Sequence, residues 1–330
     1  MTVLLPGFLD AHVHLALIDP AGLAAGGIGR VLDLGGWTPS DDPADGEPEG
    51  TASFPETRFA GQFLAAPGGY PSRQAWAPAG SACPVASPSE AAIAVARQVA
   101  VGSSVIKVTL NSAAGPVLAP DTLAAIVVAA HARMLPVAAH TEGPGQAAAA
   151  LDAGVDLLAH TPFSEALPDA LLGAMAGRMT WISTLDIHGW GEPTTEFFVA
   201  SDNLARFHAA GGRVLYGTDL GNGPLPVGLN RREIEALLAC GLSPDDVLAA
   251  LTADFPGRPA GASVNMASGA AASVDRPAPA GTVTVVPGDR PTDPHDLAGF
   301  TDWLLGARSQ PAHALPARAL TRPDLEDLRS

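Results

Sequence analysis

Short apolar runs alternate along the chain with segments that favour helices. Eight such runs predict strands, near residues 4–12, 31–34, 59–65, 105–109, 136–140, 157–160, 180–185 and 213–217. The segments between them predict helices near residues 89–100, 121–133, 145–153, 168–176, 195–210 and 231–240. Another helix is expected after Ser243-Pro244, a serine cap followed by proline in the first turn. Eight strands in βα repeats predict an α/β fold, a (β/α)8 TIM-like barrel.

Several of these apolar runs end in a polar side chain that can bind a metal ion. Parallel strands buried on both faces read as continuous apolar runs, and ligands collect at their carboxyl ends. A shared position at strand ends therefore predicts one common site rather than scattered polar residues. The residues in this position are His12, His14, Lys107, His140, His160 and Asp219.

Lys107 is the only lysine of the chain, whose other basic residues are arginines. It lies in the apolar run Val105-Ile106-Lys107-Val108, which predicts a buried strand. Arginine cannot replace lysine where a deprotonated, nucleophilic amine is needed, because a guanidinium stays protonated. The alternative is a lysine that extends its stem from a strand end into solvent, a position that arginine would fill equally well.

The types of these side chains indicate a hydrolytic metal centre. Residues i and i+2 of a strand share a face, so His12 and His14 can reach one ion. Imidazole and carboxylate ligands suit zinc, and also iron, nickel or manganese. Histidines with a carboxylate and an open position are typical of a catalytic site. The two cysteines, Cys83 and Cys240, lie far apart in the sequence, which argues against a thiolate zinc site.

Two ions about 3.5–4 Å apart can share a bridging hydroxide and polarise a substrate oxygen. Asp219 is a candidate to accept the proton of that hydroxide and pass it to the leaving group. The alternative for Asp219 is an N-cap, because Thr218-Asp219 precedes the glycine-rich turn at residues 220–223.

With these motifs, the chain resembles the binuclear members of the amidohydrolase superfamily. The matching features are Pro6-Gly7-x-x-Asp10-x-His12-x-His14, a strand lysine, two strand-end histidines and a final aspartate. The resemblance implies that His12, His14 and Asp219 hold one metal ion and that His140 and His160 hold the other. It also implies that CO2 carbamylates Lys107 and that the carbamate bridges two divalent ions, zinc first among the candidates.

Residues 106–160 look most like the prolidase and imidazolonepropionase-like branch, in Ile106-Lys107-Val108, Val137-Ala138-Ala139-His140 and Ala153-Gly154-Val155-Asp156. The resemblance implies hydrolysis of an amide-type bond in a small molecule: an acyl amino acid, a dipeptide or a cyclic amide. A lactonase, an esterase or a deaminase built on the same site is the alternative. A binding barrel without catalysis is a third hypothesis, which a missing metal ligand would have favoured.

Three further residues are candidates for substrate contact. Tyr70 and Arg73 follow the third predicted strand, where Gly68-Gly69 would let the backbone approach a ligand closely. His188 follows the seventh strand and is a candidate substrate contact or general acid. An ordinary turn with a surface arginine, and a packed or solvated loop histidine, are the alternatives.

The pattern also divides the chain into regions. We expect the hydrolase barrel over residues 1–256, a linker over 257–280 that is rich in Ala, Ser, Gly and Pro, and C-terminal strands with a tail packed on the barrel over 281–330. Within the last region, residues 281–289 predict the remnant of a strand pair, and the tail from Gln310 predicts a short helix or disorder. At most a vestigial β-sandwich is expected, and the acidic stretch 38–57 predicts a solvated loop or a lid.

Composition narrows the partners. The chain of 330 residues is 47% hydrophobic and has a formal net charge of −16, which argues against nucleic acids and anionic membranes as partners. A small-molecule substrate is expected, and a homo-oligomer is left open. The N-terminus lacks the basic region of a signal peptide, and two distant cysteines fit a reducing compartment, so we expect a cytoplasmic protein.

Overall fold

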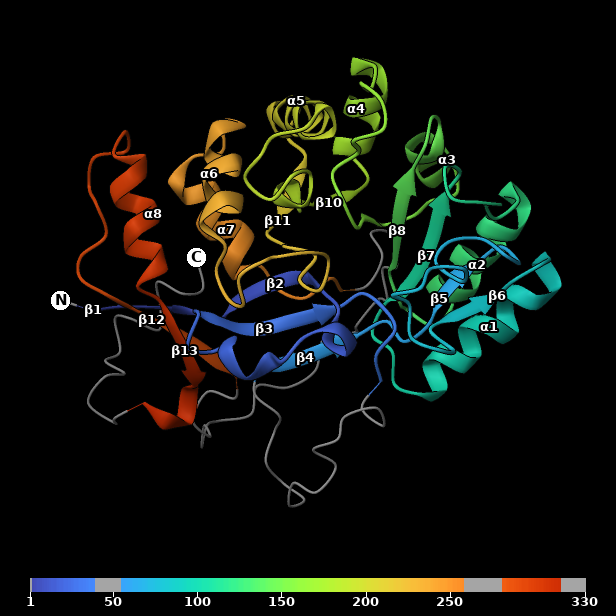
Figure 1. The fold of residues 1–330 in the computed structure, drawn as a ribbon, viewed down its shortest axis with the longest axis horizontal. Helices are drawn as coiled ribbons and strands as arrows, with labels where there is room; N and C mark the ends of the chain where they lie inside the picture. Colours follow the sequence, from blue (N-terminus) through green and yellow to red (C-terminus); the bar gives the residue numbers. More distant parts are fainter. Residues whose placement is uncertain (1, 39–54, 258–280, 316–330) are drawn as a thin grey trace, which may run out of the picture.

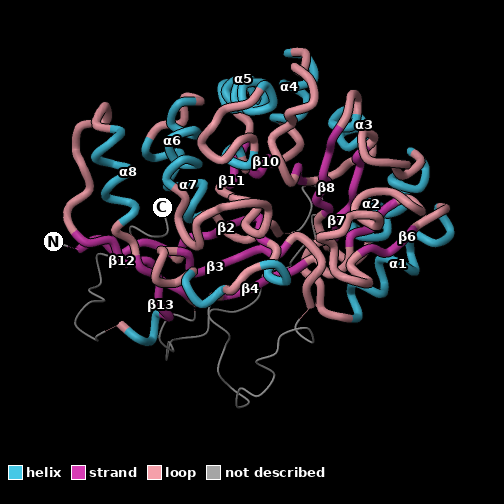
Figure 2. The backbone as a smooth tube through the Cα atoms, viewed as in Figure 1, coloured by secondary structure: helices cyan, strands magenta, loops and turns pink. Residues whose placement is uncertain are grey.

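The computed structural model describes residues 2–38, 55–257 and 281–315. Its centre is a set of parallel strands with helices on the outside (Figure 2). β2 (Phe8–Val13), β3 (Ile28–Asp33) and β4 (Glu56–Phe59) form one parallel sheet. A second sheet has the order β11-β10-β9-β8-β7-β5-β6, and all its pairs are parallel. Its strands are β5 (Phe63–Ala65), β6 (Ala82–Pro84), β7 (Ile106–Asn111), β8 (Val137–Glu142), β9 (Leu157–Leu158), β10 (Thr180–Ile182) and β11 (Arg213–Leu215).

Backbone hydrogen bonds join the two sheets into a barrel. Ala11 N–H donates to the carbonyl of Tyr216 at 2.9 Å, and His14 N–H donates to that of Leu220 at 2.8 Å. On the opposite side, Ser104 N–H donates to the carbonyl of Phe59 at 2.9 Å. β4 and β5 are two parts of the third barrel strand, separated at residues 60–62. The predicted (β/α)8 arrangement of parallel strands with alternating helices is therefore the observed fold.

The helices follow the predicted positions closely. They are α1 (Pro88–Ala100), α2 (Pro120–His131), α3 (Gln146–Asp152), α4 (Asp169–Ala176), α5 (Thr195–Ala209), α6 (Arg231–Ala239), α7 (Pro244–Thr252) and α8 (Leu297–Leu305). α7 begins with a capping box: Ser243 Oγ accepts from Asp246 N–H, and the Asp246 carboxylate accepts from Ser243 N–H. The expected signature of this helix start is thus confirmed.

Segments from the two ends of the sequence form a small separate sheet (Figure 1). β12 (Thr282–Pro287) pairs antiparallel with both β1 (Thr2–Pro6) and β13 (Arg308–Pro311). Phe8 N–H donates to Thr284 Oγ1 at 2.9 Å, and Ser309 Oγ donates to the carbonyl of Gly27 at 2.7 Å. These bonds attach the three-stranded sheet to the start of the barrel.

Four predictions about element boundaries were wrong. The single strand expected at 4–12 is two strands in different sheets: β1 pairs with β12 and β2 pairs with β3, and Gly7 between them packs against Thr282. The strand pair expected at 281–289 is the single strand β12. Gln310 itself lies in β13, because β12 offers it a partner edge, and the short helix expected in this tail is the 3-10 turn at Ala312–Ala314. The strand expected at 180–185 ends at Ile182, and a 3-10 turn follows at Leu185–Ile187.

Most of the expected acidic loop, linker and tail lies outside the described residues, in the ranges 39–54, 258–280 and 316–330.

Two layers of apolar side chains support the barrel. One lies between the strands and the helices, and the other fills the barrel interior with residues such as Val105, Ala138 and Leu215. Lys107 and His140 stand two positions further along the strands of Val105 and Ala138, so they share the inward face. The interior packing therefore ends in polar side chains at the carboxyl ends of the strands.

Candidate metal centre

Three ligand-type atoms converge at the carboxyl ends of β2 and β11. Oδ1 of Asp219 lies 3.1 Å from Nε2 of His12 and 3.1 Å from Nε2 of His14, and the two nitrogens are 3.3 Å apart. The side chains are buried, and Oδ1 of Asp219 has no well-aligned hydrogen-bond donor among the described residues. The three atoms are therefore close together, but no well-aligned hydrogen bond to Asp219 Oδ1 accounts for the short distances.

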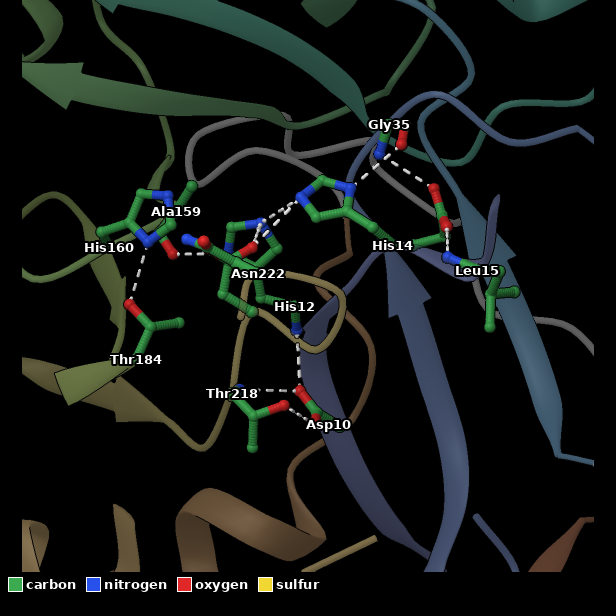
Figure 3. A network of polar contacts seen from close by, with 12 residues as sticks. Asp10, His12, His14, Leu15, Gly35, Ala159, His160, Thr184, Thr218 and Asn222 are labelled. Atoms are coloured by element: carbon green, nitrogen blue, oxygen red, sulfur yellow. Dashed lines mark hydrogen bonds and ion pairs between the residues drawn. The ribbon is translucent and has the colours of Figure 1, made fainter. Parts of the chain in front are cut away.

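The second nitrogen of each ring explains this arrangement. Nδ1 of His12 lies 2.8 Å from the carbonyl oxygen of Ala159, and Nδ1 of His14 lies 3.0 Å from that of Gly35 (Figure 3). A carbonyl only accepts, so each Nδ1 must carry the proton and donate it. In the neutral rings the Nε2 lone pairs then point at a carboxylate oxygen. Such a cluster of acceptors is stable only with a cation or an added proton between them.

The pKa shifts of His14 and Asp219 also indicate that a positive charge is favoured between these side chains. Burial lowers the pKa of His14, but the Asp219 carboxylate 3.1 Å away more than offsets this effect, and the pKa is raised. Burial alone would raise the pKa of Asp219, whereas the surrounding histidines, His12 first, hold it well below its usual range. Burial also lowers the pKa of His12 and of His160, so these rings stay neutral and available as ligands.

His160 completes a group that could hold a metal ion. The ligand atoms of His12, His160 and Asp219 all lie within 4.8 Å of one another, and all three residues are buried. Nδ1 of His160 lies 2.9 Å from Oγ1 of Thr184, which fixes the orientation of the ring (Figure 3). This buried His-His-Asp group has the composition of a metal site.

Lys107 lies in the same cavity with only 2% of its surface exposed. Burial lowers the pKa of its amine to about 7, although Asp219 and Asp33 act in the opposite direction. A substantial fraction of this amine is therefore uncharged near neutral pH, which is the form that can react with CO2. An exposed lysine would be almost fully protonated at the same pH.

His140 makes contacts that the sequence pattern did not anticipate. Its Nε2 lies 3.3 Å from Oε2 of Glu142, and the same oxygen accepts a hydrogen bond from Asn111 Nδ2 at 2.6 Å. Both partners lie on the same strand face as a predicted site residue, because side chains an even number of positions apart share a face. Glu142 follows His140 by two positions in β8, and Asn111 follows Lys107 by four in β7. The period of a strand was thus the signal that could have identified them.

The site opens into a cavity of about 200 Å³ whose walls include all six predicted metal ligands. Tyr70 and His188 also line it; the Tyr70 ring stacks on His140 with centroids 4.9 Å apart. Burial lowers the pKa of His188 to about 4, and its Nε2 has no hydrogen-bond partner among the described residues. Arg73 is exposed and is not among the residues that line this cavity; its guanidinium lies beside Gly68.

Two buried carboxyl groups that were not predicted as site residues hold the loops that carry the ligands. Asp33 accepts hydrogen bonds from the N–H groups of Leu15, which follows His14, and of Gly35, at 2.6 and 2.8 Å. Asp10 accepts from the N–H of His12 at 3.1 Å and from Thr218. Asp219 itself has φ of 57°, a left-handed conformation that aspartate tolerates better than most residues.

The comparison with solved structures identifies the fold. A search of family models and a search of curated proteins found no match. Ochratoxinase from A. niger superposes with a TM-score of 0.61 at 22% identity, covering 78% of this chain and 72% of its own. A Xaa-Pro dipeptidase gives 0.63 at 18% identity, covering 91% and 84%. A putative prolidase from Bifidobacterium longum gives 0.64 at 20% identity, covering 100% and 86%. The chain therefore has the fold of the amidohydrolase superfamily, as its motifs predicted, with a buried His-His-Asp group at the site.

Proposed function

We propose that the protein is a metal-dependent hydrolase that cleaves an amide-type bond of a small molecule. The observation that carries the proposal is the convergence of Nε2 of His12, Nε2 of His14 and Oδ1 of Asp219 within 3.3 Å, with the Nδ1 protons of both rings directed elsewhere. The fold shared with ochratoxinase, a Xaa-Pro dipeptidase and a putative prolidase supports the choice of a hydrolase.

The proposed site holds two divalent metal ions, with zinc as the first candidate. His12, His14 and Asp219 would hold one ion and His140 and His160 the other, with the carbamate of Lys107 bridging them. Because Nε2 of His140 lies beside Glu142, its Nδ1 is the nitrogen available to an ion. When bound, the ions would polarise a substrate carbonyl and make a nucleophile from water.

The side chains of the chain supply the remaining steps. Asp219 accepts the proton released when water attacks the carbonyl and delivers it to the leaving amine. Neutral His188, whose Nε2 lies free on the cavity wall, donates a hydrogen bond to the substrate carbonyl oxygen from its Nε2–H tautomer. Tyr70 packs on the ring of His140 and closes the cavity on one side.

A substrate panel tests this proposal. The protein is loaded with zinc and bicarbonate and assayed with acyl amino acids, dipeptides, cyclic amides, lactones and aryl amides. Turnover of an amide that disappears in His12→Ala and His160→Ala, with the fold retained by circular dichroism, is the expected result. Turnover that survives both substitutions would remove the metal centre from the reaction. Turnover of lactones with no amide cleaved would assign a different bond to the same site.

A further inference from the structure

The carboxyl-terminal rim of the barrel is almost free of basic residues. The segments that follow the eight barrel strands contain a single Lys or Arg, which is Arg73. Arg73 is exposed and does not line the cavity. Arg232, at the start of α6, is already paired with the buried carboxylate of Asp186 at 2.7 Å. Among the described residues that line the cavity, Lys107 is thus the only Lys or Arg, and the proposed function gives it another role.

The cavity wall contains a carboxylate, Glu142, whereas binding of an anionic substrate would require a cationic side chain. Glu142 lines the cavity and is half-buried. Its contacts with Asn111 and His140 both use Oε2. Within the described part of the chain, Oε1 has no hydrogen-bond partner. Glu142 can therefore accept a hydrogen bond from a bound ligand without losing either existing contact.

Aromatic rings surround the same opening. Tyr70, Trp76, Phe163 and Trp190 line the cavity together with Glu142. Trp76 is 42% exposed and Trp190 is 40% exposed, so parts of both rings are available to a ligand. Nε1 of Trp190 donates to the carbonyl of Asn222, another lining residue, at 3.1 Å, which fixes the ring in the cavity wall. Aromatic ring faces attract an ammonium group, and a carboxylate in the same cavity wall adds to this attraction.

We infer that the substrate carries an ammonium group or another organic cation at the end remote from the scissile bond, and that Glu142 and the aromatic rings bind it. This inference rests on the proposed hydrolase function and names its substrate class. It disfavours a carboxylate at that remote end of the substrate, since Glu142 would repel it and no arginine among the described residues lines the cavity to bind it. It favours amides of diamines and of amino-acyl chains that end in an amine.

Three amides with the same chain and different end charge test the inference. They are the 4-nitroanilides of 6-aminohexanoic, heptanoic and pimelic acids, whose ends are cationic, neutral and anionic. The zinc-loaded protein should release 4-nitroaniline from the cationic amide at least about tenfold faster, in kcat/KM, than from the anionic one. Glu142→Gln should reduce the ratio of cationic to neutral rates by about tenfold. The exposed Glu192 of the same rim, which does not line the cavity, is the matched control, and Glu192→Gln should leave that ratio unchanged.

Ratios within one variant cancel any change in metal content, which elemental analysis of each variant records. Trp190→Leu provides a second variant: it should lower the rate for the cationic amide more than the rate for the neutral one. Equal or faster cleavage of the anionic amide would overturn the inference and leave the hydrolase proposal intact. If no amide is cleaved at all, the hydrolase proposal loses its support. In that case, calorimetry measures the binding of the three compounds to the protein. The inference requires the cationic amide to bind most tightly, and any other order of affinities would contradict it.

Discussion

The carboxylate of Asp10 accepts hydrogen bonds from both the backbone N–H and the hydroxyl of Thr218, at 3.0 and 2.5 Å. The two residues are 208 positions apart in the sequence, and they join the first and last strands of the barrel. Asp10 precedes His12 by two residues, and Thr218 immediately precedes Asp219. One buried contact therefore sets the distance between two proposed ligands that come from opposite ends of the barrel sequence.

Replacing Thr218 by valine should weaken both the fold and the metal site. Valine keeps the shape of the side chain but removes the hydroxyl donor, so the fully buried Asp10 loses one of its three bonds. The free energy of unfolding should fall by about 1–3 kcal/mol, and zinc affinity should fall with it. Urea unfolding and zinc titration measure the two effects. Thr218→Ser, which retains the hydroxyl, is the control; a valine variant that matches wild type in both measurements would deny the contact this role.

Lys107 variants test the carbamate. Lys107→Ala should lose the bridge and at least about a hundredfold of activity, and Lys107→Arg should not restore it, because a guanidinium does not form the carbamate. A short carboxylic acid supplied to the alanine variant should recover part of the rate by occupying the bridging position. With 13C-labelled bicarbonate, wild type should show a carbamate carbon resonance that the alanine variant lacks. Full activity of Lys107→Arg would be incompatible with a bridging carbamate.

Asp219→Asn should separate proton transfer from folding. Asparagine also tolerates the left-handed backbone at this position, so the thermal unfolding midpoint should change little. An amide cannot accept the proton of the attacking water, and kcat should fall by about 10²–10⁴. Steady-state kinetics at matched zinc content measure this fall. A kcat equal to that of wild type would exclude Asp219 as the proton acceptor.

Glu233 should make stability depend on pH. It is fully buried behind the 3-10 turn that precedes His188, and burial raises its pKa to about 7. The folded state thus holds a proton that the unfolded state releases at lower pH, so this contribution is present in full below about pH 4.5 and is lost as the pH rises through about 7. Glutamine does not titrate, and Glu233→Gln should remove a pH-dependent component on the order of 3 kcal/mol at most.

Unfolding of wild type and Glu233→Gln at pH 5, 6, 7 and 8 measures this component. The difference in unfolding free energy between the two proteins should shift in favour of the variant as the pH rises. The subtraction removes the contributions of Asp10 and Asp33, whose pKa values burial also raises, to about 7 and about 6. A difference that stays constant over this range would mean that Glu233 titrates normally.

The barrel could be predicted because its strands are buried on both faces. Short apolar runs such as Val137 to Ala139, bounded by turn residues, are typical of such strands, and proline or a capping residue marks several helix starts. The predicted ligands lie at strand ends, and the structure places all of them around one cavity.

The remaining features depend on contacts that a local pattern does not contain. The strand divides at Gly7 because β1 pairs with β12 whereas β2 pairs with β3, and β12 also provides the edge on which β13 forms. Arg73 was predicted as a substrate contact from nearby glycines, but its guanidinium lies beside Gly68 and is not part of the cavity wall. Glu142 was missed because a carboxylate near a strand end usually faces solvent.

Metal stoichiometry of the purified protein, measured by elemental mass spectrometry, tests the central claim most directly. The protein is supplied with zinc and bicarbonate, and His12→Ala and His160→Ala serve as controls. The account predicts about two divalent ions per chain in wild type and fewer in both variants. Wild-type protein that binds no divalent ion under these conditions would contradict the metal centre, and with it the proposed hydrolase.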